Sequence, residues 1–142
     1  MVNLLLKNIK KGKIINNRIF YNCDFDELLD LRDEECFDSE WMRVYNLLNN
    51  MVVDKSYYQI IDEIRKETYL RAYKESNSSD IASCVSDDFE LIVKAYILNV
   101  DDQWLNSIIM LYAKSIFPCG NIILNNLSID DSFKMLVQNS LS

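Results

Sequence analysis

From residue 24 onward, apolar side chains recur every three or four positions, and this period constrains the fold more than any other feature. Such a period is typical of helices that bury one face. The 142 residues include only two glycines and one proline, whereas sandwiches and barrels use many of both in tight turns. The pattern therefore predicts an all-α bundle of about six helices, folded as a single domain over residues 1–142.

Acidic and hydroxyl residues predict where these helices begin. Three pairs have the spacing of a capping box, in which each side chain can satisfy an unpaired backbone N–H. The expected helices cover about residues 25–34, a segment capped by Asp38 or Ser39, about 56–75, a segment from residue 87, and a segment capped by Asp101 or Asp102. A last amphipathic stretch follows residue 128, and residues 77–80 are expected to form a loop. The capping-box pairs are Asp24 with Glu27, Ser56 with Gln59, and Asp87 with Glu90.

The apolar faces of these expected helices predict the core. The clearest face belongs to the helix after residue 39 and holds Trp41, Val44, Tyr45, Leu48 and Val52. Residues 1–22 differ, because β-branched and aromatic residues follow a turn-like Lys-Lys-Gly-Lys. They predict a short β-hairpin about Gly12, with a short helix over residues 2–10 packed on the bundle as the competing interpretation.

Charge is concentrated in one segment of the chain. Residues 23–54 carry ten carboxylates and only two cations, Arg32 and Arg43, whereas residues 1–22 carry five cations and no acid. An acidic surface repels nucleic acid and anionic membranes and attracts cationic proteins. We therefore expect a basic protein partner and neither a nucleic-acid nor a membrane partner. The basic N-terminal segment could touch phosphate, with pairing to the acidic window as the alternative.

Helix capping accounts for about half of the acidic window. It does not account for Asp30, Asp33, Glu34 and Glu35, which are expected at the C-terminal end of the first helix. Negative charge there opposes the helix dipole and costs a few tenths of a kcal/mol per residue. Of the adjacent Tyr57 and Tyr58, one must leave the apolar stripe, because neighbouring residues on a helix point about 100° apart. An exposed tyrosine suits an interface. The predicted binding residues are Asp30, Asp33, Glu34, Glu35, Asp38 and Tyr58.

The sequence predicts no catalytic residue, metal site or cofactor. It has no histidine, which removes the usual general base near neutral pH and the imidazole metal ligand. Paired carboxylates at 87–88 and 101–102 could act as acid and base or hold Mg²⁺, but both pairs are expected to cap helices. The four cysteines fit no metal or redox motif, so we expect reduced thiols, with two disulfides as the alternative. Neither a bilayer-spanning run nor a signal peptide is predicted, which favours the cytoplasm.

The stretch SCVSDDFELIVKAYILNVDDQWLNSIIMLYAKSIFP, residues 83–118, resembles part of a known family. It is similar to the C-terminal helical pair of small bacterial immunity proteins encoded beside polymorphic toxins, including those of contact-dependent growth inhibition systems. The matching elements are Ser86 to Phe89, Asp102 to Leu105 with Trp104, and Tyr112 ahead of Phe117-Pro118. The resemblance implies a cytosolic, non-enzymatic protein that binds a cognate toxin domain, often a basic nuclease, and blocks its active site. It assigns no binding residue.

Two other functions remain open on the residues alone. A helical adaptor or regulatory protein would bind a cellular protein through a groove between helices. An enzyme relying on carboxylates alone would need Asp87, Asp88 and Asp101 gathered in one pocket with a divalent ion.

Overall fold

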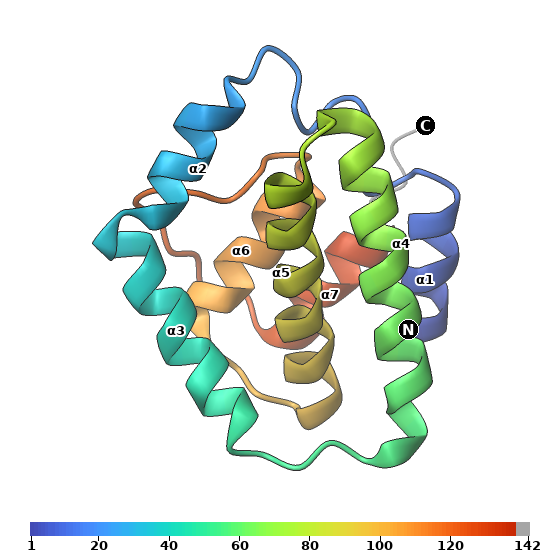
Figure 1. Cartoon of the computed structure of the whole chain (residues 1–142). Coiled ribbons are helices and arrows are strands. Elements are labelled where there is room, and N and C mark those ends of the chain that lie inside the picture. Colours follow the sequence, from blue (N-terminus) through green and yellow to red (C-terminus); the bar gives the residue numbers. More distant parts are fainter. Residues whose placement is uncertain (139–142) are drawn as a thin grey trace.

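The structure, a computed structural model, describes residues 1–138 and is all-helical in that range. Seven α-helices and one short 3-10 turn follow one another, and these residues contain no β-strand (Figure 1). The all-α prediction is therefore confirmed. The elements are α1 (Val2–Lys10), α2 (Phe25–Asp33), α3 (Glu35–Asn49), η1 (Lys55–Tyr57), α4 (Tyr58–Ser76), α5 (Ser79–Leu98), α6 (Gln103–Ala113) and α7 (Ile129–Gln138).

Helix α5 forms the centre of the bundle. It contacts α2, α3, α4 and α7, and in Figure 1 α3 and α4 flank it on opposite sides. Half of its twenty residues are buried. Helices that are apolar over most of their surface take interior positions, because solvent would otherwise meet a large apolar area. Helix α5 is therefore the scaffold on which the other elements are placed.

The N-terminal segment forms a short helix, so the hairpin prediction is wrong and the competing interpretation is confirmed. Helix α1 packs against α4 and α7, and the side-chain amide of Asn8 donates to the Val137 carbonyl at 2.7 Å. Leu5 and Ile9, one turn apart, are fully buried. Residues 11–22 then cross the bundle in turns, which bury Ile14, Ile15, Ile19 and Phe20 without pairing strands.

The start of α5 is also corrected. The helix begins at Ser79, where Ser78 accepts a hydrogen bond from the Ile81 N–H at 3.2 Å, and not at Asp87. Residues 77–80 contain only a two-residue break, Asn77 and Ser78, because burying Ile81 favours an immediate second helix. Asp87 and Asp88 thus lie in the middle of α5. The caps expected at Asp24 and Asp102 are confirmed, whereas Asp54, and not Ser56, caps the turn that precedes α4.

The stripe predicted on α3 is only partly buried. Val44 and Leu48 are in the core, together with Phe37, which lies two turns before Val44. Trp41 is half-buried and Tyr45, stacked on it, is exposed. Val52 lies outside the helix and is 90% exposed. The buried face follows residues 37, 44 and 48, so it is narrower than the predicted stripe and leaves residues 41 and 45 at its edge.

Asparagines in the left-handed conformation end α4 and α5, at Asn77 and Asn99, each with φ near 54°. A Cβ atom makes this conformation costly for residues other than glycine, asparagine and aspartate. We predict that Asn99→Ala lowers the free energy of unfolding by about 1 kcal/mol, while Asn99→Gly lowers it by less or raises it. Urea unfolding followed by circular dichroism measures both, and equal stability of the two variants would contradict this assignment.

Candidate functional site

The acidic residues meet at a sharp corner between α2 and α3. Helix α2 ends at Asp33 and α3 begins at Glu35, so Glu34 alone joins them in an extended conformation. Its carbonyl accepts the first hydrogen bonds of α3, from the N–H groups of Phe37 and Asp38 at 3.0 and 2.9 Å. The sequence predicted a longer break and a cap at Asp38 or Ser39. Burial of Phe37 explains the difference, because α3 must begin early enough to include it.

This corner divides the acids that were predicted to oppose a helix dipole between the end of α2 and the start of α3. Only Asp30 and Asp33 lie in the last turn of their helix, where negative charge is unfavourable. Glu35 and Asp38 lie in the first turn of α3, where carboxylates complement the helix dipole. The prediction that these carboxylates oppose their own helix dipole is therefore wrong for Glu35, while Asp38 occupies a first-turn position that favours an acid. What remains is a concentration of charge on one corner.

The corner carries a set of exposed carboxylates without cationic partners. We call it the acidic cluster. All five of its side chains are exposed, and none takes part in an ion pair among residues 1–138. Carboxylates without a protein partner keep their full field toward solvent, screened only by salt. The acidic cluster comprises Asp30, Asp33, Glu34, Glu35 and Asp38.

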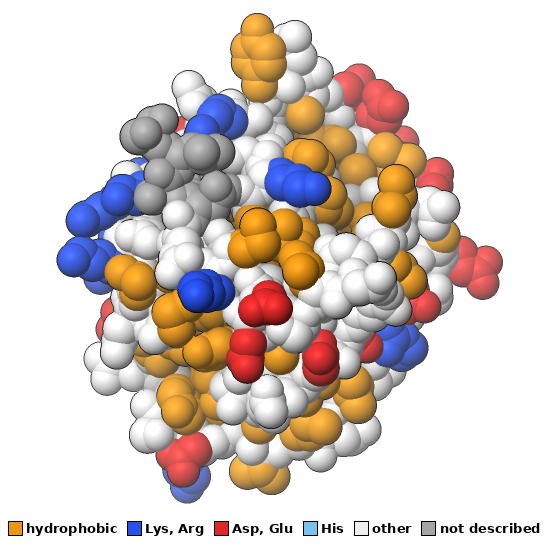
Figure 2. Space-filling model, turned by 180° about the vertical axis from the view of Figure 1, so that it is seen from behind, with side chains coloured by type: hydrophobic (Ala, Val, Ile, Leu, Met, Phe, Trp, Pro, Cys, Tyr) orange, Lys and Arg blue, Asp and Glu red, His pale blue; other side chains and the backbone are white. Residues whose placement is uncertain are grey.

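Charge is unevenly distributed on the face of the molecule that Figure 2 shows. Figure 2 shows acidic side chains along the edge formed by α2 and α3 and basic side chains gathered at the opposite edge, on the side of α1. The nearest approach between α1 and an acid joins Lys10 to Glu63 on α4, at 4.0 Å. The ion pairs of the described residues therefore do not include the predicted pairing of the basic N-terminus with the acidic window.

Arg32 is the one cation of α2, and it turns inward beneath the acidic cluster. Its guanidinium donates to both carboxylate oxygens of Asp88 on α5, at 2.7 and 2.8 Å. This planar two-point pairing is the strongest geometry available to an arginine and a carboxylate. The Asp88 side chain is 1% exposed and the Arg32 side chain 9%, so the pair lies in the core.

Three further elements converge on this pair. The Trp41 indole N–H of α3 and the Tyr112 hydroxyl of α6 donate to Asp88 at 2.9 and 2.6 Å. Arg32 also donates to the Pro118 carbonyl at 3.2 Å. Its guanidinium lies over the rings of Phe37 and Phe117, at 4.4 and 5.3 Å from their centroids. The Asp88 carboxylate thus accepts four hydrogen bonds, which compensates for the loss of its hydration.

The protonation states follow from this arrangement. Burial opposes the charge on Arg32, but the charge and hydrogen bonds of Asp88 outweigh burial and raise the pKa of Arg32 above its ordinary value. Burial, followed by the adjacent Asp88 charge, raises the pKa of Tyr112 well above its usual range. Tyr112 therefore keeps its proton and acts as a donor. The network is a charged, fully paired cluster that joins α2, α3, α5, α6 and the segment after α6.

Sequence reasoning missed the role of Arg32, although a signal was present. Phe25, Leu28, Leu29 and Arg32 follow the spacing of one helix face, which places the arginine on the inward side. The sequence pattern marks Tyr112 and Phe117-Pro118 as core or helix-ending residues, and Asp88 as a helix cap or a candidate acid. Their common partner lies 56 residues before Asp88, and no local pattern identifies a contact at that separation.

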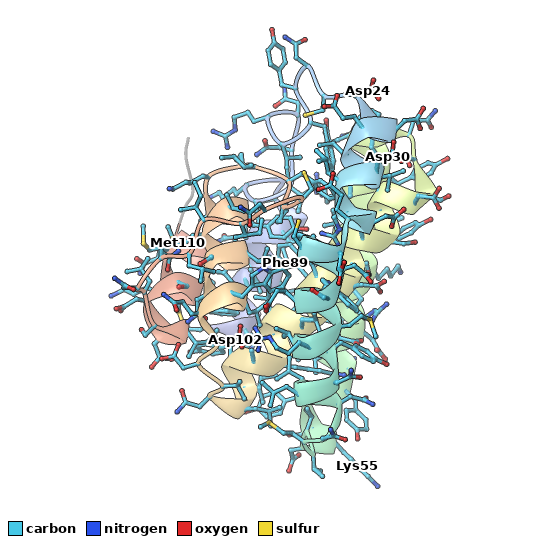
Figure 3. The ribbon with its side chains drawn as sticks, turned by 90° about the vertical axis from the view of Figure 1, so that its left-hand side faces the viewer. Asp24, Asp30, Lys55, Phe89, Asp102 and Met110 are labelled. Carbon is cyan, nitrogen blue, oxygen red and sulfur yellow. The ribbon has the colours of Figure 1, made fainter. Side chains whose placement is uncertain are left out.

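Tyr58 lies away from the acidic cluster. It is exposed at the start of α4, three residues after Lys55, and Figure 3 shows Lys55 at the opposite end of the molecule from Asp30. It lines a shallow depression together with Asp62, Glu90 and Lys94. The structure therefore brings together the five predicted carboxylates and leaves the predicted tyrosine at a separate position.

The paired aspartates do not form a common site. Asp87 pairs with Arg65 at 2.7 Å, Asp88 belongs to the Arg32 network, and Asp101 accepts from the Ile129 N–H at 3.1 Å. No group of three potential metal ligands occurs within residues 1–138. All four cysteines are free thiols. In the described part of the chain, no helix is long and apolar enough to cross a bilayer.

Comparison with known proteins identifies a family. A family model described as Immunity protein PIM1 matches residues 4–119, which is most of the chain. The matched span contains the acidic cluster and every member of the Arg32 network. A search of curated proteins returned no match.

We predict that Asp88→Asn lowers the free energy of unfolding by about 3–5 kcal/mol, because Arg32 then stays buried without a counter-charge. The double variant Arg32→Met with Asp88→Leu should lose less stability than the sum of the losses in Arg32→Met alone and Asp88→Leu alone, since neither charge is left unpaired. Urea unfolding of the four proteins in a double-mutant cycle measures this coupling. Strictly additive losses would show that the pair does not act as a unit.

Proposed function

Because the chain belongs to the Immunity protein PIM1 family, we propose that it binds a cognate toxin domain and neutralises it by covering the toxin's active site. The protein acts by binding and carries out no reaction of its own. Its site of action is the bacterial cytoplasm, and contact-dependent growth inhibition is the type of system to which it belongs. Family membership supports the neutralising role, and the following observations support the way in which it is achieved.

The acidic cluster is the proposed binding surface. Its five carboxylates lie on one exposed corner, and the only cation of α2 is withdrawn into the core. A partner that supplies lysines or arginines would relieve the repulsion between these like charges and gain attraction at the same time. The unneutralised acidic corner is the single observation that carries this proposal.

The charge of this surface favours a basic toxin domain, and a nuclease is the class that fits best. A nuclease cleft must attract the phosphates of nucleic acid, so it carries positive charge around its active site. An acidic protein that docks on such a cleft competes with the substrate for the same field. Electrostatic steering would also speed the encounter, which matters for a protein that must capture its toxin before damage occurs.

We predict that Asp33→Lys, Glu34→Lys and Glu35→Lys, made together, lower the association rate constant for the toxin domain by about 10-fold or more at low salt. The partner is a catalytically inactive form of the toxin domain encoded beside this gene. Stopped-flow fluorescence at several salt concentrations measures the rate. The wild-type rate should fall as salt rises, and the rate of the triple variant should depend on salt much less.

A matched control keeps the net charge change and moves it elsewhere. Asp62→Lys, Asp80→Lys and Asp130→Lys alter three exposed acids outside the cluster by the same total charge. This control should slow association by a few-fold at most. If both triple variants slow association equally, only the overall charge matters, and the assignment to the α2–α3 corner is wrong.

A further inference from the structure

A groove of about 410 Å³ opens beside the acidic cluster, between α3 and the segment of residues 121–124. Helix α3 contributes Cys36, Glu40 and Arg43 along one side, at the spacing of a single helix face. The start of α6 and the segment after it, with Ile122 and Leu124, form the other side. The groove is distinct from the Arg32 network, which lies in the core beneath the cluster.

The charged groups in this groove already have partners. Arg43 pairs with Glu40 and with Asp102, at 2.7 Å in each case. Asp102 in turn accepts the capping hydrogen bond from the Leu105 N–H at 3.0 Å. Arg43 does not need an anionic ligand, because its guanidinium already pairs with two carboxylates. These three side chains carry a net negative charge. The rest of the lining combines the polar Gln103 and Asn121 with the apolar Trp104, Ile122 and Leu124.

The rim of the groove presents apolar side chains to solvent. Leu124, which lines the groove, is 51% exposed, and its neighbour Ile123, outside the lining, is 92% exposed. The segment that carries them is nevertheless held in place, because the Asn125 N–H donates to the Ser107 hydroxyl at 3.0 Å and Gln103 donates to the Asn125 carbonyl at 2.9 Å. Apolar side chains on a pre-ordered segment suit an interface, since little conformational entropy is lost on binding.

The groove is continuous with the acidic cluster. The Gly120 N–H donates to the Leu31 carbonyl at 3.2 Å, which fastens the segment to the last turn of α2. Cys36, at the groove, directly follows Glu35 of the cluster. Residues 121–124 lie beyond the residues 4–119 that the family model matches, so family membership does not assign a role to this rim.

We propose that this groove anchors the toxin and takes an apolar side chain that is flanked by lysine or arginine on the toxin surface. This inference rests on the proposed function. The acidic cluster and the net negative groove select the flanking cations. Leu124 contacts the apolar side chain within the groove, and the neighbouring Ile123 extends that contact outside it. Contacts that bury an apolar side chain control mainly how long a complex lasts, whereas exposed charges control mainly how fast it forms.

The test removes the apolar side chains of Ile123 and Leu124 without changing the net charge of the protein. Ile123→Ser with Leu124→Ser should raise the dissociation rate constant for the inactive toxin domain by roughly 10-fold or more, and should change the association rate constant by less than about two-fold. The matched control is Met51→Ser with Val52→Ser. Those residues are 41% and 90% exposed, and they follow α3 at the end of the molecule where Tyr58 lies. Surface plasmon resonance measures both rate constants, and the control should match the wild type.

A second measurement uses the thiol in the groove. The rate at which iodoacetamide alkylates Cys36, followed by peptide mass spectrometry, should fall at least about five-fold when the toxin domain is bound, because bound toxin would fill the groove. Unchanged dissociation in the Ile123 and Leu124 variant, or unprotected Cys36 in the complex, would overturn the anchor. An effect in the Met51 and Val52 variant alone would place the anchor near Tyr58 instead. Absence of wild-type binding would overturn the proposed function itself.

Discussion

The buried pair of Arg32 and Asp88 is the interaction on which the rest of the structure depends. Two charges without hydration are tolerated in a core only when every hydrogen-bonding position is used. Asp88 meets this requirement with two bonds from Arg32, one from Trp41 and one from Tyr112. Each donor comes from a different helix, so the pair fixes the relative positions of α2, α3 and α6 around α5. A misplaced helix would leave a buried charge unpaired.

The same interaction produces the surface proposed to bind the toxin. Because Arg32 is committed to Asp88, the last turn of α2 has no cation to neutralise its own acids. Glu34 then turns the chain so abruptly that the first acids of α3 join the last acids of α2. The Arg32 contact with Pro118 also brings the following segment, and with it the apolar rim, beside this corner. The same placement of Arg32 therefore stabilises the core and leaves the acidic cluster without a neighbouring cation.

In the proposed complex, the acidic cluster would attract the toxin by charge, and the adjacent groove would hold it by apolar contact. The acidic cluster is exposed to solvent, so it acts at long range and its effect weakens with salt. The proposed groove acts only at contact, where an apolar side chain leaves water. A partner must satisfy both at one spacing, and this requirement offers more specificity than net charge alone.

The sequence by itself determined the helical class, the approximate position of most helices and the caps at Asp24 and Asp102, because periodicity and capping are local properties. It also located the acidic residues. Only the tertiary structure decided that Arg32 turns inward, that α2 and α3 meet at a single residue, that α5 begins at Ser79, and that Tyr58 lies far from the other predicted residues. Each of these depends on burial against residues tens of positions away, and local patterns carry no information about which distant side chain supplies the partner.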